Sequence, residues 1–173
     1  MATMTDHGDA SMPEYLYRHA SSMEHYTADI FVVWCFDDRF REAQMGFLTH
    51  VNIGHRDPES PAGGGKIFFD PEKESDREYY CRELEKSIAL HHAKEVWLFT
   101  HHDCGACGGF GRFGNSRDEE LLHHINGGKI AREFIQKRFS AIEKVRTFFV
   151  DERGVIETTH MSEASGDQIH EQV

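Results

Sequence analysis

The stretch Ile30-Phe31-Val32-Val33-Trp34-Cys35-Phe36-Asp37-Asp38-Arg39 joins β-branched and aromatic residues directly to a cysteine, an aspartate and an arginine. Such an uninterrupted apolar run is typical of a strand that is buried on both faces of a parallel sheet. A second run, residues 95–100, leads into His101-His102-Asp103-Cys104-Gly105. Because the carboxyl ends of parallel strands meet at one edge of a sheet, we expect the side chains after these two runs to converge there.

Cys35, His101 and Cys104 are the candidate metal ligands in these two stretches. Two thiolates and one imidazole form a Cys2His set, which holds zinc in tetrahedral geometry and leaves one position open for chemistry. The alternative for Cys35 is a buried core cysteine, which is a common place for a free thiol. That alternative leaves the neighbouring Asp37 and Arg39 unexplained, as well as the His-x-x-Cys spacing after the second run. A catalytic metal site is therefore the favoured interpretation.

The composition limits the class of protein. The chain has 173 residues, enough for a single domain over 1–173, with loose ends expected at 1–12 and 162–173. Its formal net charge of −11 argues against nucleic acid or an anionic membrane as a partner. The longest apolar run, residues 30–36, is too short to cross a membrane, and we recognise no signal peptide. The cysteines do not resemble a disulfide framework, so we predict a cytoplasmic protein with free thiols.

In the N-terminal half, the pattern predicts a first helix over 13–25 and a second over 40–48. Residues 50–65 are rich in Gly, Pro, Asp and Ser, which is typical of a loop, and residues 66–69 are predicted to form a short strand. Ser75-Asp76-Arg77-Glu78 has the pattern of a capping box at the start of a further helix.

That further helix would bury Cys81, Leu84 and Ile88 along one face and would lead into the strand at 95–100. Residues 108–128 are glycine-rich and are predicted to be largely irregular. A long helix is expected over 129–150, where Ile142, Val145 and Phe149 recur at helical spacing, followed by an edge strand at 154–158. Strands separated by helices predict an α/β fold with a parallel-centred sheet flanked by helices.

The two motifs together resemble the β-class carbonic anhydrases over about residues 29–107. The family's Cys-x-Asp-x-Arg is matched by Cys35, Asp37 and Arg39, and its His-x-x-Cys-Gly begins at His101. Pro61-Ala62-Gly63-Gly64 is similar to the family's Asn-Ala-Gly-Gly turn. The resemblance implies a sheet of order 2-1-3-4 and a homodimer or homotetramer. It also implies a Zn2+ cofactor and the reversible hydration of carbon dioxide to bicarbonate by zinc-bound hydroxide.

By the same resemblance, Asp37 would accept a hydrogen bond from the zinc-bound hydroxide and orient it toward carbon dioxide. Arg39 would hold Asp37 ionised through a two-pronged contact. In some family members the matching aspartate instead binds the metal, so Asp37 is either an orienting residue or a fourth zinc ligand in a closed resting state.

Ser60-Pro61 stands where the family usually has Arg-Asn, so the substrate pocket differs. Two alternatives therefore stay open. The first is a zinc hydrolase of another small heterocumulene, carbonyl sulfide or carbon disulfide. The second is a non-catalytic zinc-binding protein on the same fold.

Three further sequence patterns could indicate a function of their own. Cys104-Gly105-Ala106-Cys107 matches the Cys-x-x-Cys of thioredoxin-like proteins, but every proline lies upstream, where none can form the cis-proline that such a site needs. We expect Cys107 to pack beside the metal site. The Gly-x-Gly-x-x-Gly at 109–114 does not directly follow a strand, which argues against dinucleotide binding. His102 is either a proton shuttle or a residue bonded to the backbone.

Overall fold

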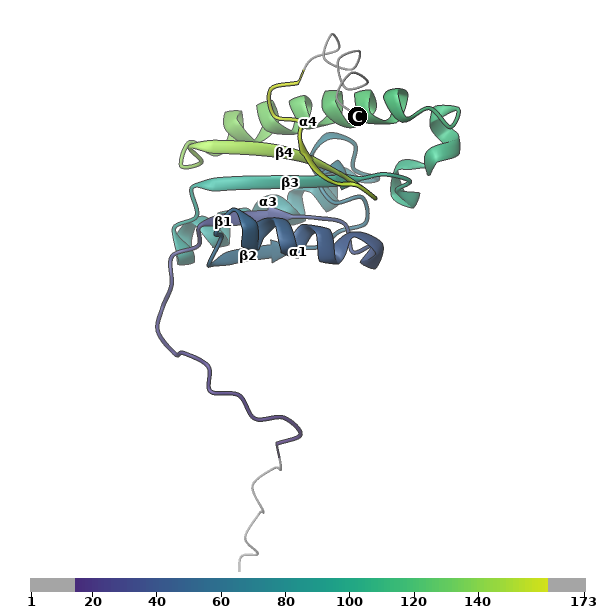
Figure 1. The fold of residues 1–173 in the computed structure, drawn as a ribbon. Helices are drawn as coiled ribbons and strands as arrows, with labels where there is room; N and C mark the ends of the chain where they lie inside the picture. Colours follow the sequence, from purple (N-terminus) through teal and green to yellow (C-terminus); the bar gives the residue numbers. More distant parts are fainter. Residues whose placement is uncertain (1–14, 162–173) are drawn as a thin grey trace, which may run out of the picture.

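The computed structural model describes residues 15–161, which fold around one five-stranded sheet of order β2-β1-β3-β4-β5 (Figure 1). The first four strands in this order pair in parallel, and β5 pairs antiparallel to β4 at one edge. The strands are β1 (Ile30–Val33), β2 (Arg56–Glu59), β3 (Glu95–His101), β4 (Lys144–Asp151) and β5 (Gly154–Glu157). The predicted parallel-centred sheet, its 2-1-3-4 order and the final edge strand are confirmed.

Helices cover both faces of this sheet. One face carries α1, and the opposite face carries α2, α3 and α4 (Figure 1). The α-helices are α1 (Arg41–His50), α2 (Lys66–Phe69), α3 (Glu74–His91) and α4 (Arg117–Arg138). Short 3-10 helices lie at Asp38–Phe40, Gly105–Cys107 and Phe110–Phe113. None of the helices within residues 15–161 is both long and apolar enough to cross a membrane.

The uninterrupted apolar run of β1 follows from this layering. Phe31 and Val33 pack in the cluster beneath α3 and α4, whereas Ile30 and Val32 pack in the cluster beneath α1. Successive side chains of a strand point to opposite faces, so a strand covered on both sides needs apolar residues at every position. The same constraint buries six consecutive residues of β3, from Val96 onward.

The predicted first helix over 13–25 is wrong for the residues that are described. Residues 15–25 contain no helix and run away from the domain as an extended segment (Figure 1). The helix prediction depended on Leu16 and Met23, which are 103% and 93% exposed among residues 15–161. A short helix is marginal without a buried apolar face. Residues 1–14 and 162–173 lie outside the described part, and the loose ends predicted there stay predictions.

Two predictions between β1 and α3 are also wrong. The expected loop at 50–65 contains the edge strand β2, whose Pro58 is tolerated because β2 pairs only with β1. The expected strand at 66–69 is the helix α2. Its first turn is closed by the N–H of Ile67 donating to the carbonyl of Gly64.

The predicted long helix over 129–150 joins parts of two elements. The helix α4 ends at Arg138, and residues from Lys144 onward form β4. The glycine-rich stretch expected to be irregular contributes Gly127 and Gly128 to α4. A side chain at Gly127 would meet the ring of Phe69 at 2.6 Å, so this glycine permits close helix packing.

The predicted capping box is wrong as well. The helix α3 begins at Glu74 after Lys73, and no side chain caps it. Ser75 lies inside the first turn. The apolar face predicted for this helix is nevertheless present, because Cys81 and Leu84 are both fully buried.

Candidate metal centre

Two neighbouring strands bring the three candidate ligands together. Cys35 follows β1, His101 is the last residue of β3, and Cys104 lies in the turn that leaves β3. Their ligand atoms all lie within 4.8 Å of one another, and the three residues are buried. Within residues 15–161 this is the one group of histidine, cysteine and acidic side chains with a metal-binding arrangement. The convergence expected at the sheet edge is therefore found, and the group could hold a metal ion.

The ring of His101 is oriented for coordination. Its Nδ1–H donates to the carbonyl oxygen of His102 at 2.8 Å, which leaves the lone pair on Nε2. That Nε2 atom is buried and has no hydrogen-bond partner. A buried nitrogen without a partner is costly unless something else binds it. With two thiols beside it, the donor set suits zinc.

Cys35 is supported by the turn that crosses it. The N–H of Gly63 donates to Cys35 Sγ at 3.3 Å, and Gly63 adopts a left-handed φ of 82° to do so. A hydrogen bond with the Cys104 thiol, together with burial, raises the pKa of Cys35 to about 12. The thiolate form therefore needs a nearby cation, and metal binding would release protons.

Asp37 and Arg39 form an ion pair beside the candidate ligands. Arg39 Nε donates to Asp37 Oδ1 at 3.0 Å, and Nη2 donates to Oδ2 at 2.7 Å. These hydrogen bonds hold the pKa of Asp37 at about 2, so the carboxylate is ionised at any ordinary pH. Asp37 Oδ2 lies 4.0 Å from His101 Nε2, which puts a fixed negative charge next to the ligand group.

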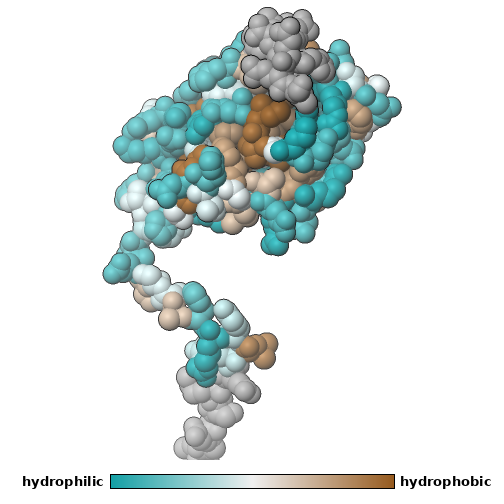
Figure 2. Space-filling model, in the orientation of Figure 1, coloured by the Kyte–Doolittle hydropathy of each residue, from teal (hydrophilic) through white to brown (hydrophobic). Residues whose placement is uncertain are grey.

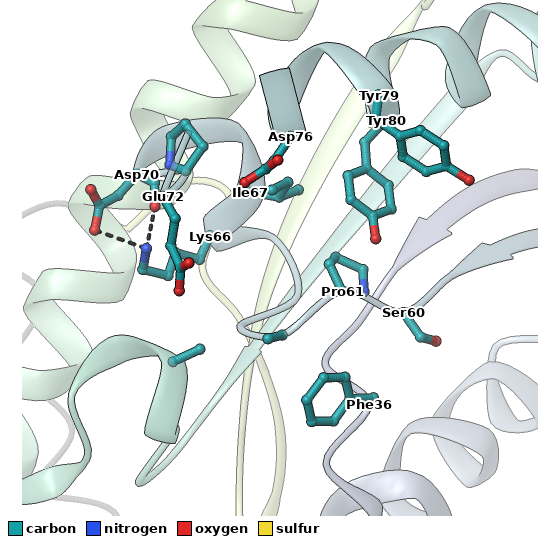
Figure 3. A pocket seen from close by; sticks show the side chains of 13 residues that line it. Phe36, Ser60, Pro61, Lys66, Ile67, Asp70, Glu72, Asp76, Tyr79 and Tyr80 are labelled. Carbon is teal, nitrogen blue, oxygen red and sulfur yellow. Dashed lines mark hydrogen bonds and ion pairs between the residues drawn. The ribbon is translucent and has the colours of Figure 1, made fainter. Parts of the chain in front are cut away.

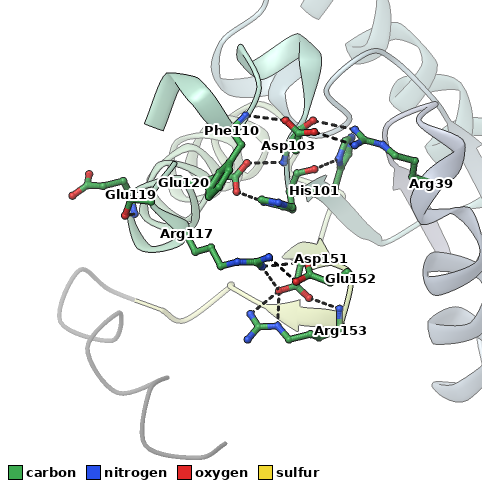
Figure 4. Close-up of polar contacts among 12 residues, drawn as sticks. Arg39, His101, Asp103, Phe110, Arg117, Glu119, Glu120, Asp151, Glu152 and Arg153 are labelled. Atoms are coloured by element: carbon green, nitrogen blue, oxygen red, sulfur yellow. Dashed lines mark hydrogen bonds and ion pairs between the residues drawn. The ribbon is translucent and has the colours of Figure 1, made fainter. Parts of the chain in front are cut away.

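The sequence interpretation missed Asp103, which ties the two ligand-bearing segments together (Figure 4). Arg39 Nη1 donates to Asp103 Oδ2 at 3.1 Å, and Nη2 donates to the Asp103 carbonyl at 3.0 Å. The other carboxylate oxygen accepts the N–H of Phe110 at 2.9 Å. Asp103 also has a positive φ of 53°, so the turn between His101 and Cys104 is held in an uncommon conformation.

The sequence interpretation also missed Glu120 of α4, which is 1% exposed. Its carboxylate accepts the N–H of Asp103 at 2.7 Å and the Nδ1–H of His102 at 2.5 Å. His102 thus bonds to a buried carboxylate and not to the backbone, while its proposed shuttle role stays a prediction. No local signal marks Glu120, because its partners lie 17 and 18 residues away in the chain.

A pocket of about 460 Å3 lies near the ligand group, and Figure 3 shows the side chains that line it. Phe36 and Ala62 line it and are adjacent in sequence to Cys35 and to its supporting turn, whereas none of the three candidate ligands lines it. The far side carries acidic residues and Lys66, whose Nζ lies 3.1 Å from Asp70 Oδ2.

The Cys-x-x-Cys and Gly-x-Gly-x-x-Gly motifs do not form a thioredoxin-like or a dinucleotide-binding site. Cys107 is 1% exposed and packs against Cys35 and Cys104. Within the Gly-x-Gly-x-x-Gly stretch, Phe110–Phe113 form a short 3-10 helix, without the strand and long helix that flank a dinucleotide-binding turn.

Comparison with known proteins gives a result only at the level of structure. No model of a known family matches the chain, and no curated protein matches it in sequence. The β-carbonic anhydrase isoform I of Trichomonas vaginalis matches with a TM-score of 0.53 and 15% identity, over 82% of this chain and 88% of that chain. The tetrameric β-carbonic anhydrases of Sordaria macrospora give a TM-score of 0.47 and 18% identity, over 76% of this chain and 81% of that one. The chain has the fold of the β-carbonic anhydrases, which confirms the resemblance inferred from its motifs.

Proposed function

We propose that this chain is a β-class carbonic anhydrase that uses zinc to interconvert carbon dioxide and bicarbonate. The observation that carries the proposal is the convergence of Cys35, His101 and Cys104 within 4.8 Å, with Asp37 Oδ2 4.0 Å from His101 Nε2. Bound zinc would supply acidified solvent at its open position. Because two thiolates offset the charge of the ion, we expect activity to rise toward alkaline pH.

The residues around the metal ligands have separate roles in this proposal. Asp37 would accept a hydrogen bond from solvent held at the metal and so orient the lone pair of that solvent toward the carbon of the substrate. Both Asp37 oxygens are held by Arg39, which favours the orienting role over direct coordination. The apolar pocket wall beside Phe36 receives the neutral substrate.

Metal analysis followed by stopped-flow carbon dioxide hydration tests the proposal. We expect about one zinc per chain and measurable hydration. Cys35→Ser should lose both, whereas Cys81→Ser should lose neither, because Cys81 lies on the buried face of α3 in a separate core cluster. A Cys35→Ser protein that keeps its zinc would contradict the ligand assignment.

A second candidate is hydrolysis of carbonyl sulfide or carbon disulfide by the same residues. The specific support is the pocket of about 460 Å3, which is larger than carbon dioxide requires, and the substituted Ser60-Pro61 in its wall. Sulfide release from carbonyl sulfide without carbon dioxide hydration would favour this activity. Zinc without either activity would indicate a non-catalytic zinc protein.

We also propose that the chain acts in the cytoplasm as a homodimer or homotetramer. The support for assembly is the projecting segment 15–25, which exposes hydrophobic residues to solvent (Figure 2). Leu16, Tyr17 and Met23 are each at least 80% exposed, an arrangement that a second copy could cover. Light scattering should give at least a dimer for the full chain and a monomer once residues 1–25 are removed. A monomeric full chain would contradict the assembly.

A further inference from the structure

Three of the four cysteines share one cluster, although only two of them belong to the candidate ligand group. Cys107 is 1% exposed and packs against Cys104, which is 2% exposed, and against Cys35. Cys107 does not join the group whose ligand atoms all lie within 4.8 Å. The metal site therefore leaves a third thiol without a role.

The backbone holds Cys104 and Cys107 at the spacing of a disulfide. The N–H of Cys107 donates to the carbonyl of Cys104 at 2.9 Å and closes a single turn. Such a turn brings the two Cα atoms within about 7 Å, which overlaps the span that a disulfide bridges. The two side chains also pack in the same buried cluster. Little backbone movement separates the dithiol from the disulfide.

We propose that Cys104 and Cys107 are an oxidisable pair, and that their disulfide removes Cys104 from the metal ligands and releases the ion. The metal-release part rests on the metal site proposed above. The disulfide itself does not, because the turn and the contact between the thiols belong to the chain alone. Cys107 is then the residue that makes oxidation of this site reversible.

A peroxide is the chemical class of oxidant that the site admits. The Cys104 sulfur attacks one peroxide oxygen, the O–O bond breaks, and the departing hydroxide takes up a proton to leave as water. The Cys107 sulfur then attacks the resulting sulfenic sulfur. The S–O bond breaks, and the hydroxide leaves as water with the Cys107 proton. The two thiols lose two electrons and two protons in total, and one hydrogen peroxide becomes two waters.

Burial selects a small oxidant. Both sulfurs lie beneath the surface, and the pocket wall at Ala106 lies between the two cysteines in sequence. Hydrogen peroxide is small enough to diffuse to a buried sulfur, whereas glutathione disulfide must bring one of its own sulfurs, with a peptide attached, into contact with it. We therefore expect oxidation by peroxide at least about tenfold faster than by glutathione disulfide at equal concentration.

The test follows the thiols and the metal separately in the full chain. Metal-free protein treated with hydrogen peroxide should give a Cys104–Cys107 disulfide by peptide mass mapping, reversed by dithiothreitol. Zinc-loaded protein should release about one metal equivalent per chain to a chelating dye as that disulfide forms. Dithiothreitol and added zinc should then restore the metal content.

Variants separate this pair from general oxidation. Cys107→Ser should still bind zinc, but its peroxide-treated form should progress to sulfinic acid at Cys104 and should not recover with dithiothreitol. Cys81→Ser, the control, should respond as the unsubstituted protein does. Absence of the disulfide from treated metal-free protein would overturn the proposal, as would full recovery of Cys107→Ser. Failure of the untreated chain to bind zinc would overturn the proposed function while leaving the disulfide test intact.

Discussion

Replacing His124 with leucine should remove a large part of the acid sensitivity of the fold. His124 lies on the buried face of α4 and is 2% exposed. Its ring centroid lies 5.1 Å from that of Phe149 and 5.2 Å from that of His123. Neither of its ring nitrogens has a hydrogen-bond partner. Burial lowers the pKa of His124 to about 3. The folded protein therefore keeps this imidazole neutral under conditions in which an unfolded chain would protonate it.

The direction and size of the effect follow from proton linkage. The pKa of His124 is about 3 in the folded state, below the unfolded value of about 6.5. The unfolded state alone therefore gains a proton as the pH falls from 6.5 toward 3, and the free energy of unfolding decreases over that window. For one such group the loss between pH 7 and pH 5 is about 2 kcal/mol. The His124→Leu protein should lack this loss.

Urea unfolding of metal-free protein at pH 7, 6 and 5 measures the effect. Between pH 7 and pH 5, the free energy of unfolding of the unsubstituted chain should fall by about 2 kcal/mol more than that of His124→Leu. At pH 7 the variant should be at least as stable, because two buried nitrogens without partners are removed and leucine has a similar volume. His50→Leu, at an exposed position of α1, is the matched control and should follow the unsubstituted chain. Equal pH dependence of the unsubstituted and His124→Leu proteins would refute the reasoning.

Two further changes test the site and its supporting turn. Arg39→Lys should keep the zinc but lower hydration turnover by roughly 10–100-fold, because lysine cannot make the two-pronged contact with Asp37; equal turnover in stopped-flow assays would contradict this role. Gly64→Ala should cost more than about 3 kcal/mol in chemical unfolding, because its new Cβ would overlap the Phe99 carbonyl oxygen at a φ of 57°. Gly46→Ala, on a helix face where a Cβ meets nothing, should instead stabilise by up to about 1 kcal/mol.

The sequence predicts the centre of this fold well because the centre depends on local pattern. The runs that form β1 and β3 are apolar at consecutive positions, and each ends at a ligand. The prediction of a helix over 129–150 failed because the spacing of Val145 and Phe149 fits both the helical repeat and the strand repeat. They are four residues apart, which fits one helical face and equally one face of a strand. Only packing of Phe148 on the α1 side of the sheet distinguishes the two.

Other features depend on contacts that no local pattern contains. Glu120 resembles any acidic residue near the start of a helix, yet it is buried because the turn after β3 brings two donors to its carboxylate. The segment 15–25 suggests a helix by composition. It lacks one because no surface within the described part of the chain covers its apolar side chains.

The pH dependence of the proposed reaction cannot originate at Asp37. Its contact with Arg39 holds the pKa of that carboxylate at about 2, so it carries the same charge throughout the range in which an enzyme is assayed. We expect a rise in hydration toward alkaline pH to report solvent at the metal. The Arg39→Lys substitution weakens the contact that lowers the pKa of Asp37. It should nevertheless lower the maximal hydration rate more than it shifts the pH at which that rate is half-maximal. A shift of the midpoint by more than about one pH unit in that variant would show that the pair controls ionisation at the metal in addition to orientation.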